Sequence, residues 1–345
     1  MTTKKLSIKK LFFTFCIIII CIIGIIAFLT TGPKTWQAIS QMKLKYMIFA
    51  FILGVLTISL DGMILKILSL AAGIKVTFSY CLKTILFYLF LSSITPTISG
   101  GEPLMIYMLT QKDVPLGKAT SIILIRGLLI LSIIALAAPV IVYFHGEIVQ
   151  NILLKNLFRY IAILLFFVLF FLAYAFFNPI KSEEIIHKIC SWIERCKILA
   201  GYSEKLEKRL KIWIDDFSNC LKEFFKYKKK ILLGTVILTT ISLGTSYLIA
   251  YTVLEGLNYH LPVLQVVMVQ FILYFLLYFT PTPGGTGVAE GGCYLIFSCS
   301  VPNHLLGIFI ILWRFFTIYI WVVLGGLLIT KTIGLDILEK ISTPL

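Results

Sequence analysis

Apolar residues in this sequence gather in long unbroken runs rather than alternating with polar ones. Six runs are long enough to cross a membrane as helices, at about 11–31, 44–66, 119–144, 157–178, 231–256 and 303–330. A spanning helix needs about 20 mostly apolar residues, whereas the strands of a membrane barrel would alternate. The pattern therefore predicts an all-α polytopic membrane protein, with residues 1–345 forming a single integral membrane domain.

Two further apolar runs, 78–94 and 264–279, each end in a segment rich in proline and glycine. The first break reads TPTISGGEP over 95–103, and the second reads TPTPGGTGVAEGG over 280–292. Irregular backbone survives at membrane depth only where it is buried in protein or lines a cavity. Each run is therefore expected to belong to a broken or re-entrant helical hairpin, which gives about eight apolar helices.

The distribution of positive charge predicts the orientation. The positive-inside rule places the tail before Leu11, the basic segment 181–230 and the C-terminus in the cytoplasm. Segment 78–111 then begins and ends inside, whereas 264–302 begins and ends outside, so the two hairpins enter from opposite faces. We expect a multi-pass protein of a bacterial cytoplasmic (inner) membrane, with both termini cytoplasmic.

The segment 181–230 cannot span a membrane, because it holds thirteen Lys/Arg and eight Asp/Glu. Its apolar residues recur at helical spacing, at Leu206, Leu210, Trp213, Ile214, Phe217, Leu221 and Phe224. This stripe predicts a cytoplasmic amphipathic helical hairpin on the membrane surface. Its lysines either bind anionic lipids or form a solvated positive-inside loop.

The two breaks belong to a larger internal repeat. Glu102 precedes Arg126 by 24 residues, and Glu290 precedes Arg314 by the same 24 residues. Both glutamates follow a Thr-Pro-Thr sequence and a glycine pair. Residues 78–144 and 264–330 are therefore predicted to be two repeats of opposite orientation, the plan of many secondary transporters.

The charged residues within the apolar runs form the candidate binding site. Each costs roughly 2.5–3.5 kcal/mol at the centre of a membrane helix. Arg126 and Arg314 are expected to hold an anionic headgroup, and Glu102 and Glu290 to pair with them or take up a proton. The alternative is that each pair only pins its hairpin to the next helix. Asp61 is a weaker candidate, near the cytoplasmic end of its span.

The breaks supply the rest of the predicted site. The expected substrate-binding positions are Gly100, Gly101, Gly284, Gly285, Thr95 and Thr280, and the expected hinge positions are Pro96, Pro103, Pro281 and Pro283. Helix N-termini at such breaks offer free N–H groups to an anion. Four tyrosines either line this site or only pack between helices, namely Tyr88, Tyr107, Tyr274 and Tyr278.

Other chemistry finds little support in the sequence. The eight cysteines form no CxxC pair, the four histidines lack metal-ligand spacing, and there is no Walker A loop. We therefore expect no cofactor, no metal, no catalytic residues and no nucleic acid partner.

The TPT-x-GGE-P motif, the PTPGG-x-G-x-x-E motif and the intramembrane arginines resemble the lysylphosphatidylglycerol synthase transmembrane (flippase-like) family. The chain is similar to the N-terminal membrane half of the bacterial multiple peptide resistance factor. The resemblance implies movement of a membrane phospholipid between leaflets, such as aminoacylated phosphatidylglycerol or a lipid-linked sugar. That factor carries a soluble acyltransferase domain after its membrane part, and no segment of these 345 residues is long enough to be one.

The function expected from these observations is that of a lipid translocator driven by a lipid gradient, membrane potential or protons. Two alternatives stay open. One is a component of aminoacyl-phosphatidylglycerol synthesis, of the phosphatidylglycerol lysyltransferase type but without its soluble catalytic domain. The other is a membrane scaffold for a separate synthase.

Overall fold

The computed structural model describes residues 17, 24, 32–95, 98–144, 204–278, 280 and 282–332, and every element in these ranges is a helix. Four helices are apolar and long enough to cross a membrane, with 27 to 29 residues each. They are α3 (Leu44–Ala71), α6 (Leu116–Phe144), α10 (Lys229–Gly256) and the stretch Asn303–Ile329. This last stretch runs through α13 (Asn303–Arg314) and the π-helical turn η4 (Phe315–Tyr319) into α14 (Ile320–Thr332). The all-helical, multi-pass prediction is confirmed at this level.

Two of the predicted spans cannot be compared with the structure, because they lie outside the described residues. The span 157–178 lies outside the described residues, and so does 11–31 except for two isolated positions. A short helix, α2 (Pro33–Ser40), precedes α3 and packs against α13. The hydroxyl of Thr35 in α2 donates to the backbone carbonyl of His304 over 2.9 Å, which fixes this contact.

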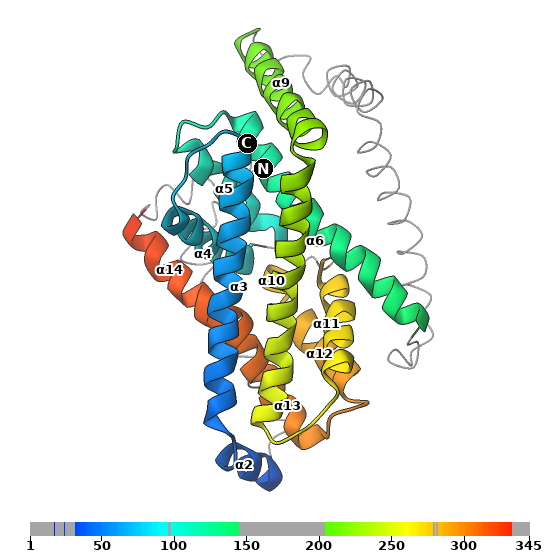
Figure 1. Cartoon of the computed structure of the whole chain (residues 1–345). Coiled ribbons are helices and arrows are strands. Elements are labelled where there is room, and N and C mark those ends of the chain that lie inside the picture. Colours follow the sequence, from blue (N-terminus) through cyan, green and yellow to red (C-terminus); the bar gives the residue numbers. More distant parts are fainter. Residues whose placement is uncertain are drawn as a thin grey trace, which may run out of the picture.

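The two proline- and glycine-rich segments interrupt helices as predicted. In the first half, α4 (Phe78–Ile94) is followed by the 3₁₀ turn η1 (Ile98–Gly101) and the short helix α5 (Glu102–Thr110). In the second half, α11 (Val263–Tyr278) is followed by η3 (Pro283–Gly285) and α12 (Val288–Phe297). Within each half the two helices pack together. Figure 1 shows α4 and α5 toward one end of the bundle and α11 and α12 toward the other.

Local chemistry explains where α4 and α11 end. Thr95 donates its hydroxyl to the carbonyl of Leu91 over 2.8 Å, and Thr280 donates to Leu276 over 3.0 Å, four residues back in each case. The second break then turns through Gly284, Gly285 and Gly287, whose φ angles are +58°, +67° and +86°. Such angles favour glycine because a Cβ atom would clash with the backbone.

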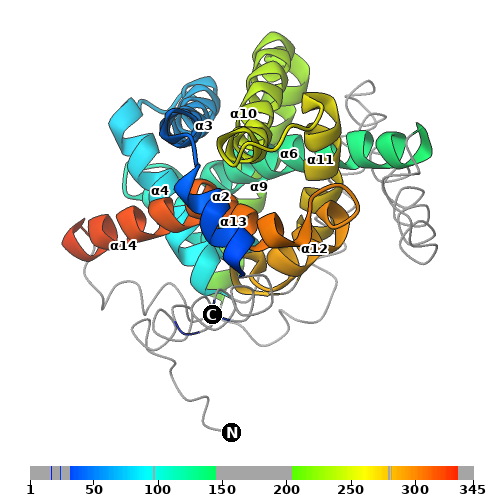
Figure 2. The same ribbon diagram turned by 90° about the horizontal axis from the view of Figure 1, so that it is seen from below.

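One long helix of each half packs against the short helices of the other half. The helices α3 and α10 lie side by side and run in opposite directions, with the start of α3 beside the end of α10 (Figure 1). The first-half helix α6 packs against α11, whereas α14 of the second half packs against α4. Seen from below, α6 and α14 extend to opposite sides of the bundle (Figure 2). This packing brings both breaks to the middle of the bundle, where η1 and η3 are in contact.

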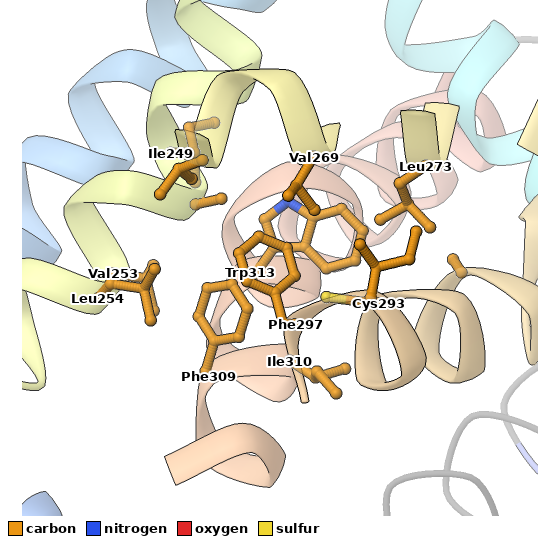
Figure 3. Packing of buried hydrophobic residues seen from close by; sticks show 14 of the residues in the cluster. Ile249, Val253, Leu254, Val269, Leu273, Cys293, Phe297, Phe309, Ile310 and Trp313 are labelled. Carbon is orange, nitrogen blue, oxygen red and sulfur yellow. The ribbon is translucent and has the colours of Figure 1, made fainter. Parts of the chain in front are cut away.

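A cluster of buried apolar side chains surrounds Trp313 in the second half. Its indole is fully buried and lies with the rings of Phe297 and Phe309 between residues of α10, α11 and α12 (Figure 3). The rings of Phe297 and Phe309 meet edge to face with centroids 4.9 Å apart, a favoured aromatic geometry. This cluster fixes the position of Arg314, the residue that follows Trp313.

The basic segment ends in a single long helix, α9 (Glu204–Tyr227), at the end of the bundle where α6 begins (Figure 1). Cys220, Leu221 and Phe224 are buried, and the backbone carbonyl of Phe217 accepts a hydrogen bond from the Ser121 hydroxyl of α6 over 3.1 Å. Over its second half the apolar stripe therefore packs on protein. The preceding part of the expected hairpin, 181–203, lies outside the described residues.

Candidate functional site

A cavity of about 230 Å³, lined by both apolar and polar side chains, lies among α3, α4, α6, α10 and α11, beside both breaks. The charged residues of its lining are Asp61, Glu102, Arg126 and Arg314. Its hydroxyl groups come from Thr57, Tyr88, Ser92, Ser93, Thr239, Ser242, Ser246, Tyr274, Tyr278 and Thr317. Polar groups inside a membrane bundle are costly and usually mark a path or a binding site.

Arg126 of α6 is only partly satisfied in this cavity. The residue is 5% exposed, yet its Nε atom has no hydrogen-bond partner among the described residues. Its Nη2 atom reaches Asp61 Oδ2 at 3.5 Å, the outer limit of a hydrogen bond. The guanidinium also lies over the ring of Tyr88, 5.2 Å from its centroid. Because a guanidinium carries five N–H donors, Arg126 keeps capacity for an anionic ligand.

Asp61 is the direct partner of Arg126, which corrects the sequence analysis. The helix α3 continues past Asp61 to Ala71, so Asp61 lies in the interior of the helix. Ser242 of α10 donates to Asp61 Oδ1 over 2.7 Å. One carboxylate thus connects α3, α6 and α10.

Glu102 was expected either to pair with Arg126 or to take up a proton, and no ion pair between Glu102 and Arg126 forms in the structure. Glu102 is the first residue of α5 and is half-buried in the cavity wall. Its Oε1 atom lies 3.6 Å from the place where a Cβ atom on Gly127 would stand. The carboxylate therefore lies beside Arg126 without bonding it, because the guanidinium points to Asp61. Among the described residues, Glu102 forms no hydrogen bond or ion pair.

The second glutamate–arginine pair is closed, as the sequence allowed. Arg314 Nε donates to Glu290 Oε1 over 2.7 Å, and both side chains are 3% exposed. Glu290 also accepts from the backbone N–H of Gly287 over 2.6 Å and from the hydroxyl of Tyr319 over 3.2 Å. Arg314 Nη2 donates to the carbonyl of Gly284 over 3.2 Å. This network ties the second break to α12, α13 and the π-helical turn.

The structure places the glycines of the breaks in different roles. Among the four predicted ones, only Gly284 borders the cavity. The N–H of Gly101 donates to the Ser92 hydroxyl over 3.1 Å, and that of Gly285 to the carbonyl of Thr282 over 3.0 Å. A Cβ atom on Gly100 would overlap Thr95. These glycines therefore allow close packing at the breaks.

Among the described break residues, Thr95, Thr280, Pro103 and Pro283 do not line the cavity. Thr95 and Thr280 direct their hydroxyls to their own helices. Pro103 occupies the first turn of α5 and Pro283 begins η3, positions where a missing N–H costs no helix hydrogen bond. Pro96 and Pro281 lie outside the described residues.

The sequence analysis did not identify the hydroxyl side chains of α3 and α10 as part of the site. Thr239, Ser242 and Ser246 recur at helical spacing along one face of α10, and Thr57 stands one turn before Asp61 on α3. That spacing within apolar runs is the signal that would have found them. Of the four tyrosines considered, Tyr88, Tyr274 and Tyr278 border the cavity, whereas Tyr107 packs in a separate apolar cluster.

The fold and the cavity define a multi-pass α-helical membrane protein with a polar site enclosed by its apolar helices. Residues 10–325 match the lysylphosphatidylglycerol synthase TM region family, and the chain belongs to this family. A relative described as a UPF0104 membrane protein, from Archaeoglobus fulgidus, is 26% identical over 316 residues. The match covers 89% of this chain and 93% of the relative. The family resemblance predicted from the two break motifs is thereby confirmed.

Proposed function

We propose that this protein moves a phospholipid across the membrane and binds its headgroup phosphate at Arg126. The observation that carries this proposal is the guanidinium of Arg126, which borders the cavity and has only one hydrogen bond among the described residues, a long one of 3.5 Å to Asp61. Buried polar groups nearly always have a partner. A phosphate oxygen is a strong acceptor for an arginine N–H, so an anionic headgroup completes this site.

A lipid fits the location of the cavity better than a water-soluble solute. The helices around it are apolar spans, and side chains such as Ile48 and Ile52 of α3 and Ile237 of α10 stay exposed on their outer faces. Apolar surface of this kind belongs against lipid tails. The headgroup would enter the cavity while its tails stay in the bilayer.

Alternating access would follow from an inverted repeat. Each half has the order long helix, short helix, break, short helix, long helix. The exchange of α6 and α14 between the halves, and the opposite directions of α3 and α10, support such a relation. The π-helical turn Phe315–Tyr319 after Arg314 offers a hinge, since such turns often occur at functional sites. Movement of one half against the other would open the cavity to either side.

The orientation proposed here places α9 and both termini in the cytoplasm of a cell with this protein in its cytoplasmic membrane. The charge of α9 and of the α9–α10 junction supports it. Lys228, at that junction, donates to the carbonyl of Ala71 and pairs with Glu223, so it also holds α9 on the end of α3. Lysines of this surface would meet anionic headgroups of the inner leaflet.

The family description favours a second candidate function. A protein related to lysylphosphatidylglycerol synthase membrane regions could serve aminoacyl-phosphatidylglycerol synthesis beside a separate synthase, as a component or a scaffold. In that case the cavity would hold product lipid without moving it. The two candidates differ in one measurable property, because only a translocator changes the leaflet in which a lipid resides.

The test is transbilayer movement of fluorescent phospholipids in proteoliposomes, read by quenching from the outer aqueous phase. Wild-type protein should expose inner-leaflet lipid faster than protein-free vesicles, and a headgroup series should rank the substrates. Arg126→Ala, confirmed as folded, should expose inner-leaflet lipid no faster than protein-free vesicles do. Equal rates for wild-type, Arg126→Ala and protein-free vesicles would reject translocation and leave the synthesis partner as the better candidate.

A further inference from the structure

Among the described residues, the charges of the cavity lining do not balance when an anionic lipid binds. Arg314 is neutralised by Glu290, which leaves Arg126 facing the two carboxylates of Asp61 and Glu102. A phosphodiester headgroup adds one more negative charge. In a site of low dielectric, a surplus of two negative charges is strongly unfavourable, and the usual response is that one group takes up a proton.

The three carboxylates differ in how firmly their charge is held. Glu290 accepts hydrogen bonds from a guanidinium, a backbone N–H and a tyrosine hydroxyl. Asp61 accepts from Ser242 and faces Arg126. Glu102 accepts no hydrogen bond among the described residues, and its Oε1 atom lies 3.6 Å from the Cβ position of Gly127, the residue that follows Arg126. When a phosphate occupies Arg126, Glu102 loses most of the compensation by the charge of that arginine.

We infer that Glu102 takes up one proton when an anionic headgroup binds Arg126, so that proton and lipid enter the cavity together. This inference rests on the proposed headgroup site. The proton comes from the aqueous phase and adds to one carboxylate oxygen of Glu102, and no covalent bond of the lipid changes. A neutral Glu102 can also donate a hydrogen bond to a phosphate oxygen.

The surroundings of Glu102 support this assignment. The titratable or charged groups that face the cavity from the elements around it are Asp61 on α3, Tyr88 on α4, Arg126 on α6, Tyr274 and Tyr278 on α11, and Arg314 on α13. Both arginines are engaged, one with Asp61 and one with Glu290. The tyrosines are neutral at physiological pH. Glu102 is therefore the one carboxylate of this lining without a bonded cation.

The experiment measures protons taken up on binding of a short-chain lipid. Full-length protein in detergent is titrated calorimetrically with dihexanoyl phosphatidylglycerol, in two buffers of different ionisation enthalpy, at several pH values between 5 and 9. Dihexanoyl phosphatidylethanolamine, which has no net charge, is the matched ligand. Asp113→Asn is the control variant, because Asp113 lies in an exposed turn at φ +57°, which asparagine tolerates.

Wild-type protein and Asp113→Asn should take up close to one proton per bound phosphatidylglycerol within this pH range and much less with phosphatidylethanolamine. Glu102→Gln should bind phosphatidylglycerol without proton uptake. Binding to wild type without uptake at any pH, or equal uptake by Glu102→Gln, would overturn the role of Glu102 and leave the headgroup site intact. Absence of binding at every pH would instead overturn the site and the proposed function with it.

Discussion

Arg314 and Glu290 form a closed ion pair, with Nε and Oε1 2.7 Å apart and both side chains 3% exposed. The same carboxylate accepts hydrogen bonds from Gly287 and Tyr319. The related arginine of the first half, Arg126, has only a 3.5 Å contact with Asp61 and an unused Nε. Two residues at matching places in the sequence therefore have different roles: Arg314 stabilises the second break, whereas Arg126 borders the cavity with one long hydrogen bond among the described residues.

Loss of one partner from the closed pair should destabilise the fold. Glu290→Gln or Arg314→Gln leaves a buried charge uncompensated, which costs about 3–5 kcal/mol in comparable cases. The double variant Glu290→Gln/Arg314→Gln should recover a large part of that loss, because no buried charge remains. Thermal unfolding in detergent, followed by tryptophan fluorescence, compares the three. Additive losses in the double variant would show that the two residues do not act as a unit.

Arg126→Gln should weaken ligand binding more than it lowers the stability of the fold. Stability should fall less than with Arg314→Gln, because Asp61 keeps its hydrogen bond from Ser242 and its side chain is 24% exposed, whereas that of Glu290 is 3% exposed. Binding of dihexanoyl phosphatidylglycerol should weaken about ten- to hundredfold, the range expected for losing a hydrogen bond to a charged group. Calorimetric titration measures the affinity. Unchanged affinity in a folded Arg126→Gln protein would remove Arg126 from the binding site.

The first break should not tolerate a methyl group at Gly101. An added Cβ atom would overlap the Ser92 hydroxyl and the Tyr88 carbonyl. Gly101→Ala should cost about 1–3 kcal/mol, as overpacking usually does. Gly291→Ala is the matched control, because a Cβ atom there meets open space on a helix. Thermal unfolding of both variants checks the contrast, which equal melting temperatures would contradict.

Cysteine labelling tests the proposed orientation. Cys299 is exposed in the turn between α12 and α13, and we expect an impermeant maleimide to label it from outside intact cells. Cys220 on α9 should be labelled only in inverted vesicles. Burial raises the pKa of the Cys220 thiol, so a smaller fraction of it is thiolate at a given pH. Because the thiolate is the reactive form, alkylation of Cys220 should accelerate only above about pH 8.5, the ordinary pKa of a cysteine thiol.

The labelling uses single-cysteine versions of the protein, with the other seven cysteines replaced by serine. Labelling of Cys299 from the cytoplasmic side alone would invert the orientation proposed here. Rapid labelling of Cys220 near pH 7 would show that α9 does not stay packed on α6.

The helices could be predicted from sequence because their cause is local. Long apolar runs determine α3, α6, α10 and α13–α14, and the Pro/Gly motifs determine where α4 and α11 stop. The exchange of α6 and α14 between the halves could not be predicted, since it depends on contacts between residues far apart in the chain. The packing of α9 on α6 has the same origin, because an amphipathic stripe does not reveal whether lipid or protein covers it.

The sequence predicted which charged residues belong to the site, but it did not predict all of the ion pairs that they form. The repeated spacing identified Arg126, Arg314, Glu102 and Glu290, all of which line the cavity or bond to residues that do. It also suggested identical pairs, whereas Arg126 contacts Asp61. The reason is that α3 crosses beside α6 and presents a carboxylate from its interior. Spacing within a repeat carries no information about such a contact between separate helices.

A reversible block of the cavity tests translocation through it most directly. Ser242→Cys, in a chain without other cysteines, places a thiol in the cavity wall, and Ile237→Cys places one on the exposed outer face of the same helix. Both are treated in proteoliposomes with a bulky methanethiosulfonate, assayed for fluorescent lipid movement, and assayed again after reduction. Movement should stop with modified Ser242→Cys, return on reduction, and stay unchanged with Ile237→Cys. Full lipid movement by a Ser242→Cys protein that mass spectrometry shows to be completely modified would contradict the account.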